Sequence, residues 1–266
     1  MRFSLDSVLV NKMIDSHCHI NDPAYINNPE KYIKEATSAG VNKLLVVGYD
    51  LKSSKDALEI ASKFDNVYAA IGVHPSEVKK ASDNDLKEIE KMLSNPKVIA
   101  VGEIGLDYHW DKDLIIRNMQ REWFENQIEL ANKHHLPISI HCREANEDCL
   151  NILKKHKPIC SGVMHCYSGS PEMVKDFIKI PVMLGIGGVV TFKNGIKLKE
   201  VVKIVPEDMY LLETDAPYLA PAPHRGELNH SKYLPLIAEE IAKLRGEPID
   251  KVIETTDRNF AKLFKI

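Results

Sequence analysis

Two histidines separated by one residue follow the first apolar segment of the chain. Residues 13–15 have the composition of a short strand, and His17 and His19 come directly after them. Alternate side chains of an extended chain point to the same side, so the two imidazoles should face one way and Cys18 the other. Imidazole nitrogens are common ligands of divalent metals. The pair therefore suggests part of a metal site, although two ordinary surface or core histidines would have the same spacing.

Four more possible ligands stand where later apolar segments end. They are Glu103, His141, His165 and Asp215. One such residue alone is usually part of an ordinary loop, but this many in the same position favour a shared site. Four histidines and two carboxylates exceed the ligands of one tetrahedral ion. In two-metal sites the ions lie about 3.5–4 Å apart and one carboxylate can bridge them. We expect Glu103 to be that bridge.

Short β-branched segments alternate with longer amphipathic segments along the chain. The strands are expected at residues 13–15, 43–47, 67–72, 98–102, 137–141, 162–165, 182–184 and 209–213. The helices are expected at residues 30–39, 54–63, 86–93, 114–134, 144–155, 172–178, 196–202, 232–245 and 249–264. Gly40 is placed to end the first helix, and Ser82 and Asp83 to begin the third.

Eight strands, each followed by a helix, predict an α/β fold of the TIM type, a (β/α)8 barrel. No linker or change of composition divides the chain, so we expect one domain over residues 13–266, preceded by an extension at 1–12. An open doubly wound sheet is the alternative, but its glycine-rich phosphate turn is missing after the first strand. In a barrel the chemistry belongs at the carboxyl ends of the strands, which is where the six possible ligands fall.

The overall composition is that of an ordinary globular protein of 266 residues. Its net charge is −3, with 35 basic and 38 acidic side chains, whereas proteins that hold long nucleic acids are usually basic. Any nucleic acid should therefore be held locally. Five cysteines without a small-domain pattern favour a reducing compartment, and no apolar run is long enough to span a bilayer. We expect a cytoplasmic monomer that does not contact membranes.

The segments around these residues carry a resemblance to a known family. They are Asp15-Ser16-His17-Cys18-His19, Gly72-Val73-His74-Pro75, Gly102-Glu103-Ile104-Gly105-Leu106-Asp107, Ile140-His141-Cys142-Arg143, His165-Cys166-Tyr167-Ser168-Gly169 and Glu213-Thr214-Asp215-Ala216-Pro217-Tyr218. With them the chain resembles the TatD-type metal-dependent hydrolases (TatD-related deoxyribonucleases) of the amidohydrolase superfamily, from the first strand to the last.

The resemblance implies a barrel with two divalent cations. It assigns one cation to His17, His19, Glu103 and Asp215, and the other to Glu103, His141 and His165. Glutamate in the fourth strand, where many superfamily members carry a lysine, favours the TatD branch. The chain departs from the family after Arg225 and Gly226, where members commonly have a lysine and an arginine. Here Glu227 and Leu228 stand instead, so the protein should hold phosphate less firmly or bind a different substrate.

The expected activity is metal-dependent phosphodiester hydrolysis, from an end of single-stranded DNA. The cations would activate water and Glu103 would bridge them, with Asp215 as the base. Substrate phosphate could be held by side chains of the carboxyl-end loops, namely His74, Arg143, His224 and Arg225. Tyr108, Trp110 and Tyr167 could stack a terminal base. Zinc, manganese, iron or nickel suit the histidines better than magnesium, which relatives are often assayed with.

Two other functions fit the same residues. The metal pair could attack an ester or amide, as in an aminoacyl-tRNA deacylase or a lactonase. The barrel could also be a metal-stabilised binding protein without activity, which a candidate base in Asp215 argues against.

Overall fold

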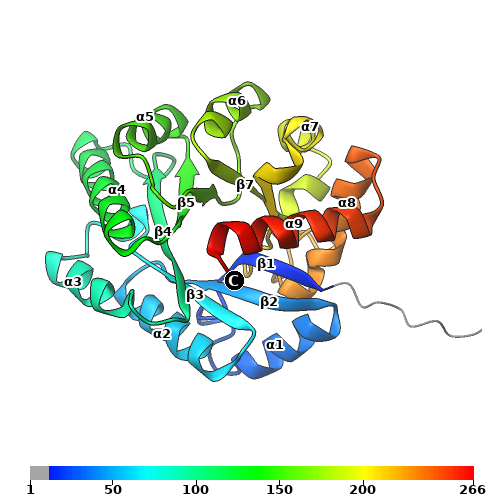
Figure 1. The fold of residues 1–266 in the computed structure, drawn as a ribbon, viewed down its shortest axis with the longest axis horizontal. Coiled ribbons are helices and arrows are strands. Elements are labelled where there is room, and N and C mark those ends of the chain that lie inside the picture. The colour runs from blue at the N-terminus through cyan, green and yellow to red at the C-terminus, as the bar shows by residue number, and fades with distance from the viewer. Residues whose placement is uncertain (1–11) are drawn as a thin grey trace, which may run out of the picture.

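A ring of eight parallel strands forms the centre of the protein in a computed structural model that describes residues 12–266 (Figure 1). The strands are β1 (Met13–Cys18), β2 (Val41–Val47), β3 (Val67–Ile71), β4 (Val98–Asp107), β5 (Ile138–Arg143), β6 (Gly162–Met164), β7 (Val182–Ile186) and β8 (Tyr210–Leu212). Each strand pairs with the next in the chain. Just beyond their ends β1 and β8 meet, because the Asp215 amide donates to the His17 carbonyl at 2.9 Å and the His19 amide to the Ala216 carbonyl at 2.7 Å. The predicted TIM-type (β/α)8 barrel is confirmed.

Helices surround the ring, as the amphipathic segments predict. They are α1 (Pro29–Ser38), α2 (Leu51–Lys63), α3 (Asp83–Met92), α4 (Leu114–His134), α5 (Asn146–His156), α6 (Pro171–Lys179), α7 (Ile196–Ile204), α8 (Leu234–Arg245) and α9 (Ile249–Phe264). Local sequence fixes several ends. Ser82 and Asp85 form a capping box at α3, and Gly40, with a φ of 89°, follows the end of α1. The bounds of α4 and α9 agree with the prediction.

The last helix, α9, lies across the end of the barrel where the strands begin (Figure 1). Its Phe260, Leu263 and Phe264 are buried against residues that fill the inside of the ring, among them Leu45 and Val163. A second and larger core lies between the strands and the outer helices. The interior of the barrel is therefore packed with side chains, and one end is closed.

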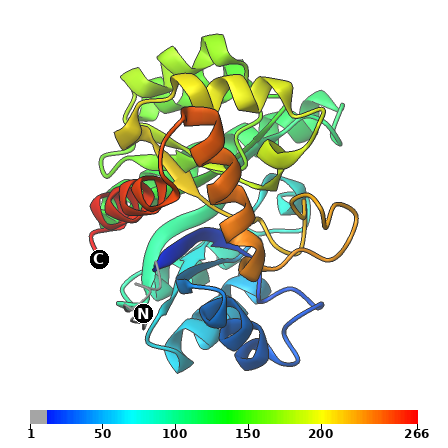
Figure 2. The same cartoon turned by 90° about the vertical axis from the view of Figure 1, so that its right-hand side faces the viewer.

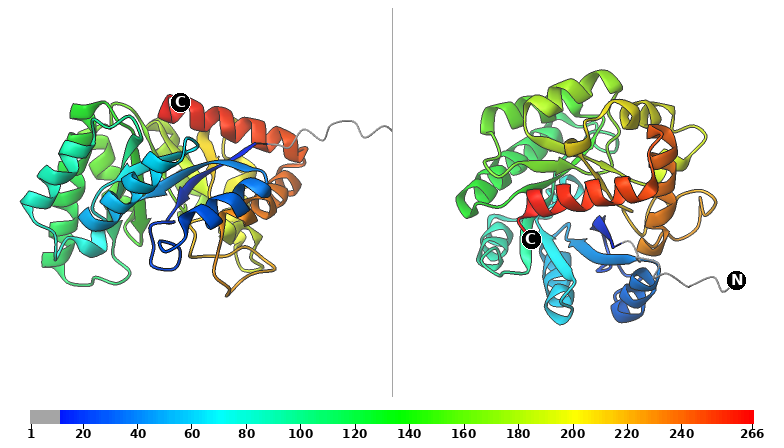
Figure 3. Two further views of the ribbon diagram at one scale, coloured as in Figure 1. Left: turned by 90° about the horizontal axis from the view of Figure 1, so that it is seen from below. Right: turned by 45° about the vertical axis from the view of Figure 1, so that its right-hand side comes forward.

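The loops that follow the strands gather at the other end. Figures 2 and 3 show the loops after β1 and β8 on the side of the barrel away from α9. All six possible metal ligands belong to this end. Within residues 12–266 no helix is both long enough and apolar enough to cross a membrane. The predicted extension at 1–12 lies, apart from Lys12, outside the described residues.

Candidate metal centre

The carboxylate of Glu103 lies between two groups of histidines at the open end of the barrel. Its Oε2 is 3.6 Å from His17 Nε2 and 3.7 Å from His19 Nε2. Its Oε1 is 2.9 Å from His141 Nδ1 and 2.7 Å from His165 Nε2. Each carboxylate oxygen therefore faces its own histidine pair, which is the arrangement of a carboxylate that bridges two cations.

Asp215 completes the first group. Its Oδ1 is 3.6 Å from His19 Nε2 and 4.0 Å from His17 Nε2, and the two Nε2 atoms are 3.2 Å apart. Ligand atoms about 2.1 Å from one tetrahedral ion lie about 3.4 Å from one another. The spacing of these donors, with Glu103 Oε2 as the fourth, therefore fits a divalent cation. Asp215 has a φ of 57°, a strained conformation that often accompanies a functional role.

The second group is closer together. His141 Nδ1 and His165 Nε2 are 3.3 Å apart, and both contact Glu103 Oε1. At these distances both nitrogens can donate hydrogen bonds to Glu103 Oε1 when they carry protons. A cation would replace those protons.

The far ring nitrogens of His19 and His141 each face an acceptor within hydrogen-bond distance. His19 Nδ1 is 2.8 Å from the Val47 carbonyl, which cannot donate, so Nδ1 carries the hydrogen and Nε2 can supply a lone pair. His141 Nε2 is 3.2 Å from Asp107 Oδ2, which leaves Nδ1 for a metal. His165 Nδ1, in contrast, is 3.8 Å from the buried Glu213 carboxyl and has no hydrogen-bond partner among residues 12–266. Partners of this kind orient metal-binding imidazoles.

Asp107 and Glu213 were not assigned a role from the sequence. Asp107 is four residues after Glu103 in the same strand, so strand alternation would have placed both on one side. Glu213 accepts a hydrogen bond from the Cys166 amide, and a Cβ at Gly185 would collide with its carboxyl group. Glycine at position 185 therefore makes room for a carboxyl group beside His165.

His74 joins the site in a different state. Its Nε2 is 3.5 Å from Glu103 Oε1, but its Nδ1 accepts the Ser76 amide hydrogen at 3.1 Å. The neutral ring must therefore carry its hydrogen on Nε2 and point a donor into the site. Burial lowers the pKa of His74 to about 3, although Glu103 opposes the shift. His74 can thus donate to a substrate oxygen but brings no positive charge at neutral pH.

Charges within the site are strongly coupled. Burial disfavours ionised His19, yet Asp215 and Glu103 raise its pKa to about 9. Burial likewise opposes charge on His141, but Asp107 and Glu103 raise its pKa to about 10. Burial also opposes ionisation of Glu103, and the neighbouring His165 and His74 outweigh it and hold the pKa well below its usual value. The carboxylates are therefore ionised and attract positive charge into a buried place.

The other three predicted phosphate-binding residues lie on the surrounding loops. Arg143 is exposed two residues beyond His141, with its guanidinium 5.5 Å from the centre of the Trp110 ring. His224 Nδ1 is 3.0 Å from Glu227 Oε2. Arg225 donates to Asn194 at 3.3 Å. Of the four predicted phosphate-binding residues, His74 alone contacts the six possible ligands within residues 12–266, and binding of phosphate by all four stays a prediction.

Two of the three aromatic residues expected to stack a base are buried. Tyr167 is 2 % exposed and Tyr108 is 8 % exposed, because their rings pack into the outer core. That part of the expectation is wrong for them. Trp110 is 71 % exposed and is the one of the three that can meet a base.

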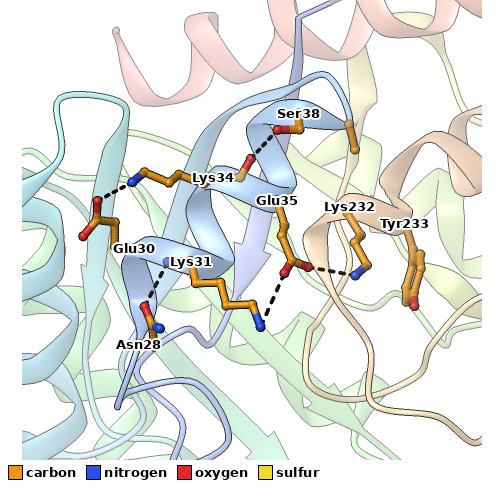
Figure 4. A pocket seen from close by; sticks show the side chains of 9 residues that line it. Asn28, Glu30, Lys31, Lys34, Glu35, Ser38, Lys232 and Tyr233 are labelled. Carbon is orange, nitrogen blue, oxygen red and sulfur yellow. Dashed lines mark hydrogen bonds and ion pairs between the residues drawn. The ribbon is translucent and has the colours of Figure 1, made fainter.

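A surface groove lies beside α1, where Lys232 and Tyr233 approach it (Figure 4). Its charged side chains are paired with each other: Lys34 contacts Glu30 at 2.6 Å, and Lys232 contacts Glu35 at 2.8 Å. None of the six possible ligands lines it. The groove is therefore separate from the metal centre.

Known proteins are similar to this chain in both sequence and fold. The sequence model of the family described as TatD related DNase matches residues 14–265. YabD of Bacillus subtilis (strain 168), an uncharacterized metal-dependent hydrolase, is 41% identical over 255 residues, which are 96% of this chain and 99% of YabD. YcfH of Escherichia coli (strain K12), also an uncharacterized metal-dependent hydrolase, is 32% identical over 258 residues, 96% of each chain. The crystal structure of YjjV, a TatD homolog from Escherichia coli K12, matches with a TM-score of 0.92 at 30% identity and covers 97% of this chain and 100% of its own. The chain belongs to the TatD-related DNase family of metal-dependent hydrolases.

Proposed function

We propose that the protein hydrolyses phosphodiester bonds at an end of single-stranded DNA, using two divalent cations. The observation that carries the proposal is the Glu103 carboxylate, whose two oxygens face two separate histidine pairs at 2.7–3.7 Å. A single ion would need only one of these groups. The open end of the barrel, at the carboxyl ends of the strands, is where enzymes of this fold carry out catalysis.

The residues divide between the two cations in a simple way. His17, His19 and Asp215 would hold one, His141 and His165 would hold the other, and Glu103 would contact both. The imidazole donors favour zinc, manganese, iron or nickel, with magnesium as a weaker fit. When bound, such ions supply Lewis-acid activation of water and of the phosphoryl group.

Asp215 is the proposed base. Burial opposes its ionisation, but His19 and His165 outweigh burial and keep the pKa of the carboxyl below its usual value. The carboxylate would accept a proton from the attacking water while the water oxygen bonds to phosphorus. It would then return that proton to the oxygen that leaves as the phosphorus–oxygen bond breaks. The Nε2 hydrogen of His74 would donate to a phosphoryl oxygen.

Glu103→Gln tests the proposal because the amide keeps the shape but cannot bridge two cations as an anion. We expect turnover of a short single-stranded oligonucleotide to fall by at least about 1000-fold, together with a lower content of bound metal. Glu59→Gln on the outer surface of α2, where Glu59 pairs with Lys63 at 2.6 Å, is the control. Comparing 3′- and 5′-labelled oligonucleotides would give the end at which digestion starts. Full activity with Gln at position 103 would refute the two-cation mechanism.

One observation favours a second candidate, an ester or amide hydrolase such as an aminoacyl-tRNA deacylase or a lactonase. His224 is engaged by Glu227, which stands where family members commonly have a lysine, so the mouth of the barrel offers less positive charge to a phosphate. Activated water can attack either kind of substrate. Turnover of aminoacyl-tRNA or lactones by wild-type protein that leaves oligonucleotides intact would favour this candidate over the nuclease.

A further inference from the structure

Trp110 is a large apolar side chain held in solvent beside the metal centre. It lies in the loop between β4 and α4 and is 71 % exposed. Burying a ring of this size is strongly favourable, so its exposure in an ordered loop calls for an explanation.

One carboxylate connects this loop to the metal centre. Asp107 Oδ2 contacts His141 Nε2 at 3.2 Å, while Asp107 Oδ1 accepts the backbone amide hydrogens of His109 at 2.9 Å and Trp110 at 3.4 Å. The same side chain thus orients a predicted metal ligand and the backbone of Trp110. The backbone of Trp110 is therefore connected to His141 through one residue.

Further contacts hold the loop from its other side. His109 Nδ1 is 2.6 Å from Glu144 Oε1, and Lys112 Nζ is 3.2 Å from Glu144 Oε2. The amide of Tyr108 donates to the Arg143 carbonyl at 2.9 Å. The backbone is therefore well supported, and the indole remains 71 % exposed although the His109 ring contacts it edge-on, with the ring centres 4.6 Å apart.

Arg143 adds a charge next to the ring. Its guanidinium lies 5.5 Å from the centre of Trp110, within the range of a cation–π contact, and the residue is two positions beyond His141. An exposed aromatic face next to a guanidinium is the combination that proteins use for single-stranded nucleic acids, where bases stack and phosphates pair with arginine.

We infer that Trp110 and Arg143 form a nucleotide subsite, in which the indole stacks on a base near the scissile bond and the guanidinium binds an adjacent phosphate. This inference rests on the proposed function, since it names how a single strand would be held. It predicts that the protein recognises the base by its flat face, with little preference for sequence.

A cycle of two changes tests the stacking contact. Trp110→Ala is compared with wild type on oligonucleotides that carry one abasic position at the first, second or third nucleotide from either end. With the intact oligonucleotide we expect KM to rise about 5- to 150-fold in Trp110→Ala. With the abasic position at the stacked nucleotide, the two proteins should have KM values within about twofold of each other. Trp110→Tyr should recover most of the binding because it keeps a ring.

Ile159→Ala is the matched control. Ile159 is also exposed, at 68 %, but it precedes β6 and so belongs to the end of the barrel away from the metal centre. The KM of Ile159→Ala for the intact oligonucleotide should equal that of wild type. Metal content and thermal unfolding of Trp110→Ala show whether the site and fold persist.

The outcomes separate the two proposals. If the KM of Trp110→Ala is the same for the intact oligonucleotide and for the one with an abasic position at the stacked nucleotide, the subsite is supported. Equal loss of binding for intact and abasic oligonucleotides, or no loss at all, overturns it while DNA hydrolysis by wild type still supports the nuclease. If wild type does not cleave any oligonucleotide, the nuclease proposal fails and the subsite fails with it.

Discussion

At the scale of single residues, the state of each ring nitrogen divides the histidines of the site into two kinds. His19 and His141 donate a hydrogen from the far nitrogen to an acceptor, so the nitrogen that faces the centre can supply a lone pair once it has lost its proton. His74 accepts the Ser76 amide and keeps a hydrogen. The same residue type therefore supplies both lone pairs and hydrogen-bond donors, and the backbone around each ring decides which.

Cation binding should release protons. Without a cation, the pKa values of about 9 for His19 and about 10 for His141 mean that both rings are charged at pH 7. Each cation needs the lone pair of one of these rings, so about two protons should leave these two rings when both cations load, and affinity should fall as pH falls below about 10. Calorimetric titration with zinc in buffers of different ionisation enthalpy measures this number. Loading without proton release would contradict the raised pKa values.

Glu227 should weaken the binding of phosphate-containing substrates. It contacts His224 at 3.0 Å and adds a negative charge to the loop after β8. We expect Glu227→Lys to lower KM for an oligonucleotide by about two- to fivefold, which is the size of effect that exposed charge pairs usually have. The decrease in KM should be smaller at high salt, because salt screens exposed charges. Glu59→Lys on α2 adds the same charge away from the mouth and serves as the control. An unchanged KM would mean that this loop does not meet the substrate.

The six possible ligands could be named from the sequence because each follows an apolar segment. The contact of Asp107 with His141 was not predicted. Nor was it predicted that Trp110 alone of the three aromatics would be exposed, since burial of Tyr108 and Tyr167 depends on helices packed over them. The contacts of Asp15 could not be predicted from the alternation of side chains along a strand, because the pairing of β1 with β2 is irregular between Asp15 and Cys18. Its carboxylate binds Thr214 and Ser231, which are about 200 residues away in the chain.

At the scale of elements, the sequence predicted which segments are strands and helices better than where some of them end. β4 runs on to Asp107, five residues past the predicted end at 102, because Gly105 and Leu106 pair with β5. Glycine at both positions 102 and 105 makes this segment look like a turn. The start of α2 at Leu51 follows from Asp50, whose side chain caps the helix with Ser53.

The sequence of α9 did not indicate that this helix would close one end of the barrel. Its apolar stripe predicts a helix that packs on something, and only the fold places Phe260 and Phe264 against the inside of the ring. Asp257, in the same helix, has an oxygen that is buried without a hydrogen-bond partner in the described part of the chain. Burial raises the pKa of its carboxyl to about 7, and Ile14 and Lys43 only partly oppose the shift.

Asp257→Asn should therefore stabilise the protein at neutral and alkaline pH. Between pH about 4 and 7 the unfolded chain has lost this proton while the folded one keeps it, so the folded state is progressively destabilised as pH rises. Above pH 7 we expect the variant to gain roughly 1–2 kcal/mol in free energy of unfolding, and below pH 4 no gain, as measured by urea unfolding. A gain that is the same at every pH would show that the charge of Asp257 is not its cause.

At the scale of the whole molecule, the net charge of −3 limits how a nucleic acid can be held. With Arg143 and Arg225 as the arginines proposed to bind phosphate, about two phosphates should be neutralised. The logarithm of oligonucleotide affinity should then fall with the logarithm of salt concentration at a slope of about −1.5. Fluorescence titration of catalytically inactive Glu103→Gln protein between 50 and 300 mM salt (roughly the usual range) measures the slope. A slope steeper than about −4 would require a basic surface that the proposal does not include.

Because α9 covers the starting ends of the strands, the metal centre can be reached only from the open end of the barrel in the described part of the chain. A polymer cannot be threaded through this protein from front to back, because apolar side chains fill the middle and Phe260 stands behind them. A product released at the metal centre would have to leave through the same open end by which the substrate entered, past the uncleaved part of the substrate. Under the proposed function, each round of cleavage would therefore include an exit step, and small fragments would escape more easily than long ones.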